Sequence, residues 1–253
     1  MPSCFSSRPA SVSGRLLQLM ACMAFVGASG FAGAEAAPYL AAGELRLTDY
    51  LASPPADAAT QAEDRRAVLD AQRRRTPEQE ARARRDDVWR DAVFSFGQGI
   101  LPDGFEAGRL PLTQRCFSRA QDDLVQTLLP AKKQYGRPRP YEQDTLLRPL
   151  LPPPVGDAYP SGHAMFGYLA ATLLGMAVPE RRDALFARAR EHAASRVIAG
   201  VHYPSDLAAG QVAAAALAAR LMATPAAVAG FAAMQAELRV NGLAGANNEE
   251  EQP

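Results

Sequence analysis

The sequence has 253 residues, in which 27 lysines and arginines balance 27 aspartates and glutamates, so the formal net charge is zero. This neutral balance gives no reason to expect a surface that binds nucleic-acid polymers or other polyanions. The length suits one domain with a sizeable hydrophobic core. Composition therefore argues against a basic nucleic-acid-binding chain, and the function has to be inferred from motifs.

The first 36 residues have the features of an export signal. Arg8 and Arg15 give a positive start, residues 16–34 are largely apolar, and small residues around Ala34 offer cleavage sites. We predict a signal peptide over residues 1–36 and a periplasmic or secreted protein. The alternatives are a single membrane-spanning helix and a lipoprotein signal that ends at Cys22.

The remaining chain contains no apolar run as long as the roughly 18 residues of a membrane span, so no mature span is expected. Cys4 and Cys22 would leave with the signal, and Cys116 would remain alone. The mature protein would then form no internal disulfide, and packing would supply its stability.

The first predicted helix begins at Thr76. This residue is a suitable N-cap, Pro77 suits the first helical position, and Gln79 can complete a capping box. We expect the helix to continue toward Phe96. Its buried stripe would consist of Val88, Ala92 and Phe96.

A second helix is predicted from apolar or small residues repeated four apart, and it should end at Pro130. The repeat consists of Leu112, Cys116, Ala120, Leu124 and Leu128. Pro179 and Pro225 mark the starts of two further helices, and residues 207–222 are typical of a closely packed core helix. No strand-like alternation occurs. We therefore expect an all-α, single-domain helical bundle over residues 37–245, followed by a disordered tail over 246–253.

A charged stretch between residues 63 and 87 is typical of solvated helix faces and not of a nucleic-acid site. It comprises Arg65, Arg66, Arg73, Arg74, Arg75, Arg82, Arg84 and Arg85 with Glu63, Asp64, Glu78, Glu80, Asp86 and Asp87. His192 follows Glu191 and is expected at the surface. Residues 94–105 contain three glycines and are either a flexible lid or an ordinary turn.

Pro160 precedes a strongly helical run that extends to Val178, so Ser161, Gly162 and His163 should occupy its first turn. Free N–H groups and the helix dipole make such a turn suitable for an anion. Gly162 would allow close approach, and Ser161 would add a hydroxyl donor. The alternative is an ordinary helix start.

The stretch from His202 to Asp206 has a similar form. Pro204 suits the first position of a helix, which places His202 in an exposed loop before it and Asp206 in its first turn. Asp206 could then contact His202 and fix the tautomer of its ring. Alternatively, Asp206 could only complement the helix dipole.

Three motifs occur in order: K-x6-R-P from Lys132 to Pro140, P-S-G-H at 160–163, and S-R-x5-H-x3-D from Ser195 to Asp206. Together they resemble the superfamily that joins type-2 phosphatidic-acid phosphatases, bacterial class A non-specific acid phosphatases and vanadium haloperoxidases. The first motif is similar to the K-x-x-Y-x-R-x-R-P form of the class A enzymes. The resemblance implies a helical fold of the acid phosphatase and vanadium-dependent haloperoxidase type.

The resemblance also implies residue roles. His202 would be the nucleophile that forms a phosphohistidine, His163 the general acid, and Asp206 the group that orients His202. The implied phosphate-binding residues are Lys132, Arg139, Ser161, Gly162 and Arg196. Tyr135, Arg137, Asp157 and Tyr159 are possible pocket residues. Ser195 is expected to be structural.

These roles imply an exported, metal-independent acid phosphatase that acts on soluble phosphomonoesters. No metal or cofactor is expected, because the sequence has only three histidines and lacks a metal-ligand spacing. Vanadate is expected to inhibit. The alternatives are a vanadium-dependent haloperoxidase, a lipid-phosphate phosphatase and a non-catalytic phosphate-binding protein. A homo-oligomer is also expected from the resemblance.

Overall fold

The computed structural model describes residues 37–89, 91–154 and 156–245. The predicted signal peptide and the predicted tail lie outside the described residues. Within these residues the regular secondary structure is helical, without strands, so the all-α prediction is confirmed. The α-helices are α1 Ala58–Arg74, α2 Pro77–Arg85, α3 Ala92–Gly97, α4 Pro111–Tyr135, α5 Pro140–Gln143, α6 Gly162–Ala177, α7 Arg182–Ile198, α8 Pro204–Met222 and α9 Pro225–Val240. Short 3₁₀ helices occur at Leu47–Asp49, Ala107–Arg109 and Pro179–Arg181.

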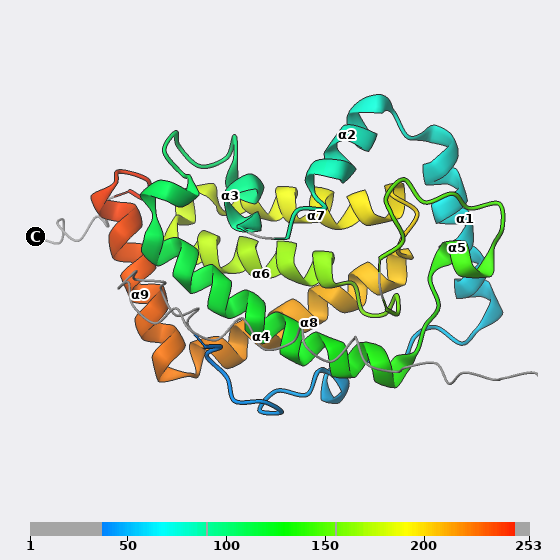
Figure 1. Ribbon diagram of the computed structural model, residues 1–253, viewed down its shortest axis with the longest axis horizontal. Helices are drawn as coiled ribbons and strands as arrows, with labels where there is room; N and C mark the ends of the chain where they lie inside the picture. The colour runs from blue at the N-terminus through cyan, green and yellow to red at the C-terminus, as the bar shows by residue number, and fades with distance from the viewer. Residues whose placement is uncertain (1–36, 90, 155, 246–253) are drawn as a thin grey trace, which may run out of the picture. The chain divides into compact units, whose positions relative to one another are not determined.

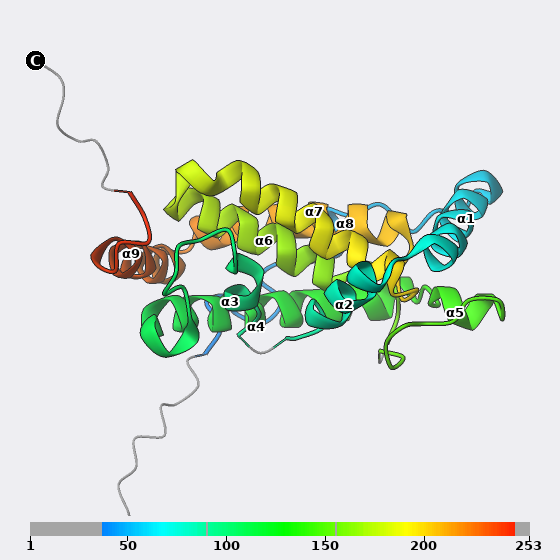
Figure 2. The ribbon, with the colours of Figure 1, turned by 90° about the horizontal axis from the view of Figure 1, so that it is seen from above.

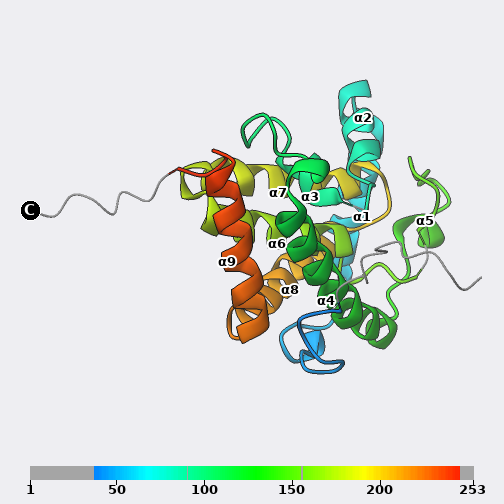
Figure 3. The same ribbon diagram turned by 60° about the vertical axis from the view of Figure 1, so that its left-hand side comes forward.

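Helix α6 lies at the centre of the bundle. It packs most extensively against α7 and α8, and α4 covers a further side (Figures 1 and 2). Helix α9 crosses one end of these helices and packs on α4 (Figure 3). Helices α1, α2 and α5 lie at the other end, where α6 and α8 begin (Figure 1). That end is where the motifs come together.

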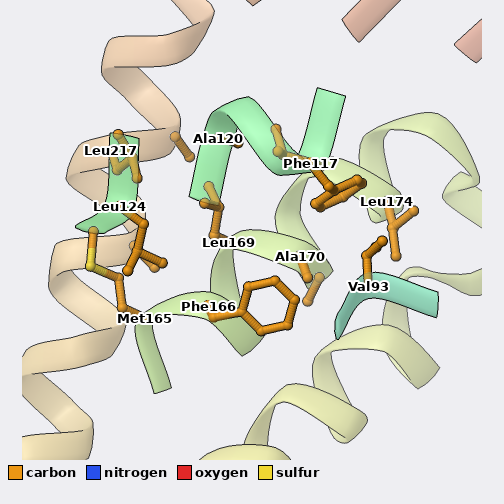
Figure 4. Packing of buried hydrophobic residues seen from close by; sticks show 14 of the residues in the cluster. Val93, Phe117, Ala120, Leu124, Met165, Phe166, Leu169, Ala170, Leu174 and Leu217 are labelled. Atoms are coloured by element: carbon orange, nitrogen blue, oxygen red, sulfur yellow. The ribbon is translucent and has the colours of Figure 1, made fainter. Parts of the chain in front are cut away.

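The position of α6 follows from its composition. Apolar and small residues surround the whole helix, and such a helix is stable only when neighbours cover it on every side. Figure 4 shows Phe166 and Leu169 of α6 beside Phe117 and Leu124 of α4. All four are at most 2% exposed, and burial of each contributes roughly 1.5–3 kcal/mol.

Helix α8 approaches the beginning of α6 closely at Gly210. A Cβ atom on this glycine would lie 2.6 Å from the carbonyl oxygen of Ser161, so a larger residue would force the helices apart. Nearby, the backbone N–H of Ser161 donates to the carbonyl oxygen of Asp206 at 3.0 Å. The two motif-bearing helix starts are therefore fixed against each other by main-chain contacts.

The predicted start at Thr76 is confirmed, but the predicted length is wrong. Thr76 and Gln79 form the expected capping box, and α2 then ends at Arg85. The chain turns at Asp86 and Asp87, which pair with arginines of α7, and a separate α3 begins at Ala92. Val88, expected in a buried stripe, is 50% exposed because it lies in this connection.

The predicted end of the second helix at Pro130 is also wrong. Helix α4 continues through Pro130 to Tyr135 and ends at Gly136, whose φ of 57° suits a glycine cap. A proline inside a helix removes one hydrogen bond at a cost of about 3 kcal/mol. Beyond the proline, the packing of Ala131 and Tyr135 against the hydrophobic core offsets part of that cost. Leu112, the first member of the predicted repeat, is 39% exposed, whereas the other four are buried.

The remaining helix starts agree with the prolines that predicted them. Pro179 opens a short 3₁₀ helix that leads into α7, and Pro225 begins α9. Within the described chain, no single helix has the length and apolar composition of a membrane span. Helices α8 and α9 satisfy those two criteria only as a pair, and they meet at a bend of 95°.

Candidate active site

The residues of the three motifs come together where α6 and α8 begin. His163 lies in the first turn of α6, and His202 lies two residues before α8. Lys132 lies near the end of α4, Arg139 is the residue before α5, and Arg196 lies in the last turn of α7. Lys132, Arg196 and His202 are all close enough to His163 to lower its pKa electrostatically. Five separate elements thus contribute to one site.

His202 is held from both sides of its ring. Its Nδ1 lies 3.3 Å from Oδ2 of Asp206, and its Nε2 lies 3.3 Å from Nη1 of Arg139. A guanidinium can only donate, so Nε2 accepts and the proton of the neutral ring lies on Nδ1. Asp206 also accepts from the backbone N–H of Tyr203 at 2.8 Å. The geometry leaves the Nε2 lone pair directed at a cationic group.

His202 is buried and not exposed as the sequence suggested. Its side chain is 4% exposed, because the beginning of α8 and the Arg139 side chain enclose it. Burial lowers the pKa of His202 to about 4, and the positive charges of Lys132 and Arg139 act in the same direction, whereas Asp206 opposes them. The ring is therefore neutral at mildly acidic pH, which is the state that a nucleophile requires.

Asp206 remains ionised although it is fully buried. Burial by itself would raise the pKa of this carboxyl, but the hydrogen bond from His202 and the charge of Arg137 hold the pKa below its ordinary value. Arg137 Nη1 donates to Asp206 at 2.6 Å. Arg137, expected in the pocket, thus lies behind the His202–Asp206 pair.

His163 is surrounded by a different set of groups. Its ring meets the indole of Trp89 edge to face, with centroids 5.5 Å apart. Its Nε2 lies 3.6 Å from Oδ1 of Asp87, beyond hydrogen-bonding distance, and this nitrogen has no hydrogen-bond partner among the described residues. Burial, followed by the charge of Arg196, holds the pKa of His163 well below its usual range.

The three motif cations are buried and fixed largely by main-chain carbonyls. Lys132 Nζ donates to the carbonyl oxygen of Asp157 at 2.6 Å, and Arg139 donates to that of Val201 at 2.9 Å. Arg196, which is completely buried, donates to Asp87 at 2.8 Å and to the Ala83 carbonyl. Burial, followed by the charge of Arg139, lowers the pKa of Lys132 to about 7.

Several other predicted residues have structural contacts. The hydroxyl of Tyr135 donates to the Leu51 carbonyl at 2.9 Å, and that of Tyr159 donates to the Ala52 carbonyl at 2.7 Å. Both tyrosines therefore fasten the segment before α1.

The Asp157 carbonyl holds Lys132, as described above. Ser195 Oγ accepts from Arg196 Nε at 3.1 Å and so orients that guanidinium.

The P-S-G-H turn is built as a capped helix start. Ser161 is the N-cap of α6, and its hydroxyl accepts from the Ala164 N–H at 3.3 Å. A Cβ on Gly162 would lie 2.8 Å from the Leu128 side chain, so packing against α4 already favours glycine there. Phosphate binding by Ser161 and Gly162 stays a prediction.

His192, expected at the surface, is only 3% exposed. Its Nδ1 lies 3.1 Å from the carbonyl oxygen of His163, and its ring packs against Phe96 and Phe166. The surface prediction was wrong because this face of α7 packs on α6. The spacing of Leu185, Ala189, His192 and Arg196, all buried, is the signal that would have revealed it.

The charged stretch likewise contains residues that are not solvated. Asp64 and Asp86 are buried and pair with Arg137 and Arg188, and Asp87 pairs with Arg196. Asp64 lies four residues before the buried Val68, so it shares the apolar face of α1. That spacing was a usable sequence signal, whereas nothing in the sequence indicated Asp87.

Residues 94–105 comprise the end of α3 and a packed turn. The rings of Phe94 and Phe105 lie 5.1 Å apart, and a Cβ on Gly97 would lie 2.7 Å from Phe105.

The described residues contain no group of three or more His, Cys, Asp or Glu side chains arranged to hold a metal ion.

The chain is similar in sequence to a protein family and to several known proteins. Residues 112–228 match the family model of the PAP2 superfamily. The non-specific acid phosphatase of Salmonella typhimurium is 38% identical over 118 residues, which cover 43% of this chain and 45% of that protein. The non-specific acid phosphatase of Providencia stuartii is 33% identical over 106 residues, which cover 38% of this chain and 40% of that protein. The chain thus matches less than half the length of these curated relatives.

Among solved structures, a bacterial vanadium-dependent iodoperoxidase is similar with a TM-score of 0.53 and 18% identity. The similarity covers 68% of this chain and 52% of the iodoperoxidase. At this identity the likeness concerns the fold alone, and it agrees with the helical architecture described above.

Proposed function

We propose, from the match of residues 112–228 to the family model of the PAP2 superfamily, that the protein is an exported, metal-independent acid phosphatase. It hydrolyses phosphomonoesters through a phosphohistidine on His202. The observation that carries the proposal is the setting of His202, with Nδ1 at Asp206 and Nε2 at Arg139, both at 3.3 Å. This arrangement suits nucleophilic attack by Nε2.

In the first step the phosphoryl group of the substrate binds among Lys132, Arg139 and Arg196. Nε2 of His202 attacks phosphorus, and the bond between phosphorus and the ester oxygen breaks. The departing oxygen takes a proton from His163, so an alcohol leaves and His163 becomes neutral. The three cations stabilise the negative charge on the equatorial oxygens.

In the second step His163 accepts a proton from water while the water oxygen attacks phosphorus. The phosphorus–nitrogen bond breaks, inorganic phosphate leaves, and both histidines return to their starting states. While the ring carries phosphorus it is positively charged, and the Asp206 carboxylate stabilises that charge through Nδ1–H. No metal ion is needed for either step.

The decisive experiment compares two activities of the purified protein. Release of phosphate from p-nitrophenyl phosphate is measured in EDTA, and oxidation of bromide or iodide by peroxide is measured after addition of vanadate. Phosphate release in EDTA, inhibited by vanadate, supports the phosphatase. Halide oxidation without phosphate release would favour the haloperoxidase, and neither activity together with tight phosphate binding would favour a binding protein.

Two further assays address substrate class and export. Phosphatidic acid in vesicles tests the lipid alternative, and preference for it over soluble monoesters would contradict the proposal. Export is supported by the charge and apolar pattern of residues 1–36. Cell fractionation and N-terminal sequencing of the expressed protein test export, and light scattering tests the expected homo-oligomer.

A further inference from the structure

A buried chain of charged side chains continues behind His202. Asp206 contacts His202 through Oδ2, and its Oδ1 accepts from Nη1 of Arg137 at 2.6 Å. The other terminal nitrogen of Arg137, Nη2, donates to Oδ2 of Asp64 at 2.8 Å. The side chains of Asp64, Arg137 and Asp206 are 5%, 10% and 0% exposed. The chain therefore links helix α1 to the proposed nucleophile.

Asp64 is held firmly in this position. Its Oδ1 accepts from the backbone N–H of Ser205 at 3.1 Å, and its Oδ2 accepts from the Ser205 hydroxyl. Ser205 Oγ in turn accepts from Arg137 Nη1 at 2.7 Å. Asp64 is thus fixed to the first turn of α8, the same turn that carries Asp206.

The charges of Asp64, Arg137 and Asp206 explain why a carboxylate in addition to Asp206 is useful. Arg137 approaches Asp206 more closely than His202 does, 2.6 Å against 3.3 Å. Asp206 and Arg137 alone would have no net charge beside the imidazole. Addition of Asp64 gives the buried group a net charge of −1, and charges act strongly in a site shielded from water.

The other groups that face His202 are cationic or histidine side chains. Arg139 contacts its Nε2, while Lys132 of α4 and His163 of α6 interact with it electrostatically. The positive charges disfavour the cationic ring that forms when Nε2 bonds to phosphorus. A net negative group at Nδ1 is therefore needed to counter them.

We propose that Asp64 is a positioning residue for the His202 nucleophile. Its carboxylate neutralises part of the positive charge of Arg137, so that the Asp206 carboxylate keeps more of its negative charge for the Nδ1–H of His202. This inference rests on the proposed phosphohistidine mechanism. Asp64 does not touch the substrate and acts only through Arg137 and Asp206. It lies outside the segment that matches the PAP2 superfamily, residues 112–228.

The test uses the full-length protein and the substitution Asp64→Asn. The matched control is Arg65→Gln, which removes the neighbouring contact of α1 with Asp144 at 2.6 Å but leaves the chain to His202 intact. Two readouts are taken: kcat and KM on p-nitrophenyl phosphate, and the imidazole ¹⁵N spectrum near pH 6.5. With only three histidines in the sequence, single substitutions assign the His202 signals.

Asp64→Asn is expected to lower kcat about 10- to 100-fold, by analogy with loss of the carboxylate behind a metal-bound histidine, with KM little changed. The Nε2 of His202 should stay unprotonated, because Arg139 still donates to it, but the ¹⁵N signal of the protonated Nδ1 should shift as its hydrogen bond to Asp206 weakens. Arg65→Gln should preserve both the rate and the spectrum. Equal losses in the two variants would show that anchoring of α1 matters, and an unchanged His202 spectrum in Asp64→Asn would also overturn the inference.

The double variant Asp64→Asn/Arg137→Gln provides a second test, because Asp206 then regains its full charge. It should return the His202 Nδ1 signal to its wild-type position, and it remains informative if the single variant does not fold. A double variant whose His202 Nδ1 signal differs from the wild-type position would contradict the charge argument. If the wild-type protein releases no phosphate, the proposed function fails, while the spectra still decide whether Asp64 controls His202.

Discussion

The Nε2 atom of His163 lies 3.6 Å from Oδ1 of Asp87, in the connection between α2 and α3. Burial and the surrounding positive charges otherwise hold the pKa of His163 well below its usual range. A general acid must carry a proton before the leaving group departs. Asp87 is the carboxylate placed to favour that protonated form.

We expect Asp87→Asn to lower the pKa of His163 further, because it removes the nearby negative charge. The high-pH limb of the rate profile should then move to lower pH, and kcat on an alkyl phosphate near pH 6 should fall several-fold to about tenfold. The rate on p-nitrophenyl phosphate, whose leaving group needs little protonation, should fall much less. His163→Ala should show the same substrate pattern, more severely.

The matched control is Asp91→Asn in the same connection, where the carboxylate accepts from Gln114 at 2.9 Å and does not contact His163. Its profile should resemble that of the wild type. Equal losses of Asp87→Asn on both substrates would count against the assigned acid.

His202→Asn should abolish turnover, by several orders of magnitude. Asparagine can keep a donor toward Asp206 but has no nitrogen that attacks phosphorus. The covalent intermediate is measured with ³²P-labelled substrate and an alkaline denaturing quench, since phosphohistidine is stable to alkali. Label should be present on wild-type protein and on His192→Asn, which loses a different buried histidine. Label that persists on His202→Asn would refute the nucleophile.

Lys132 has its pKa lowered to about 7, so it should lose its positive charge as the pH rises through neutrality. The KM of the wild type for a phosphomonoester should therefore increase between pH 6 and 8.5. Lys132→Arg should flatten this increase, because arginine stays protonated, although its kcat should be lower from altered geometry. Lys133→Arg, at the exposed neighbouring position, is the control. A steep KM profile in Lys132→Arg would exclude Lys132 as the cause.

His192 should make the fold sensitive to acid. Burial lowers its pKa to about 4, below the ordinary value of about 6.5. Its contribution to stability is thus fully present above pH 6.5 and is lost as the pH falls toward 4, by on the order of 3 kcal/mol. His192→Asn, which cannot be protonated, should show a weaker loss in urea unfolding measured at pH 7 and pH 4.5. Identical pH dependence in both proteins would contradict this assignment.

Local sequence rules predicted the helix starts well, because a cap or a proline acts within a single turn. Thr76, Pro204 and Pro225 all illustrate this. The helix ends were predicted poorly, since they depend on distant partners: α4 continues past Pro130 because residues beyond it are buried by other elements.

In the candidate site, too, local contacts could be predicted from the sequence, whereas contacts between distant residues could not. Spacing placed Asp206 in the first turn of α8, one turn from His202, and the structure brings the two side chains together. Spacing along α7 also carried a signal for the burial of His192, but it did not reveal the partners of Arg137 and Arg196. Those pairings join residues about 73 and 109 positions apart, and only the packing of α1 and α2 on the bundle decides them.

The segment from Asp64 to Asp87 affects where the N-terminal boundary of this domain lies. It supplies the anionic or carbonyl partners of Arg137, Arg188 and Arg196, all of which lie within residues 112–228. Excision of that stretch, or its transplantation into a chimera, would leave three guanidinium groups without these partners in a low-dielectric interior. The portion recognisable between relatives is therefore smaller than the portion that must fold together.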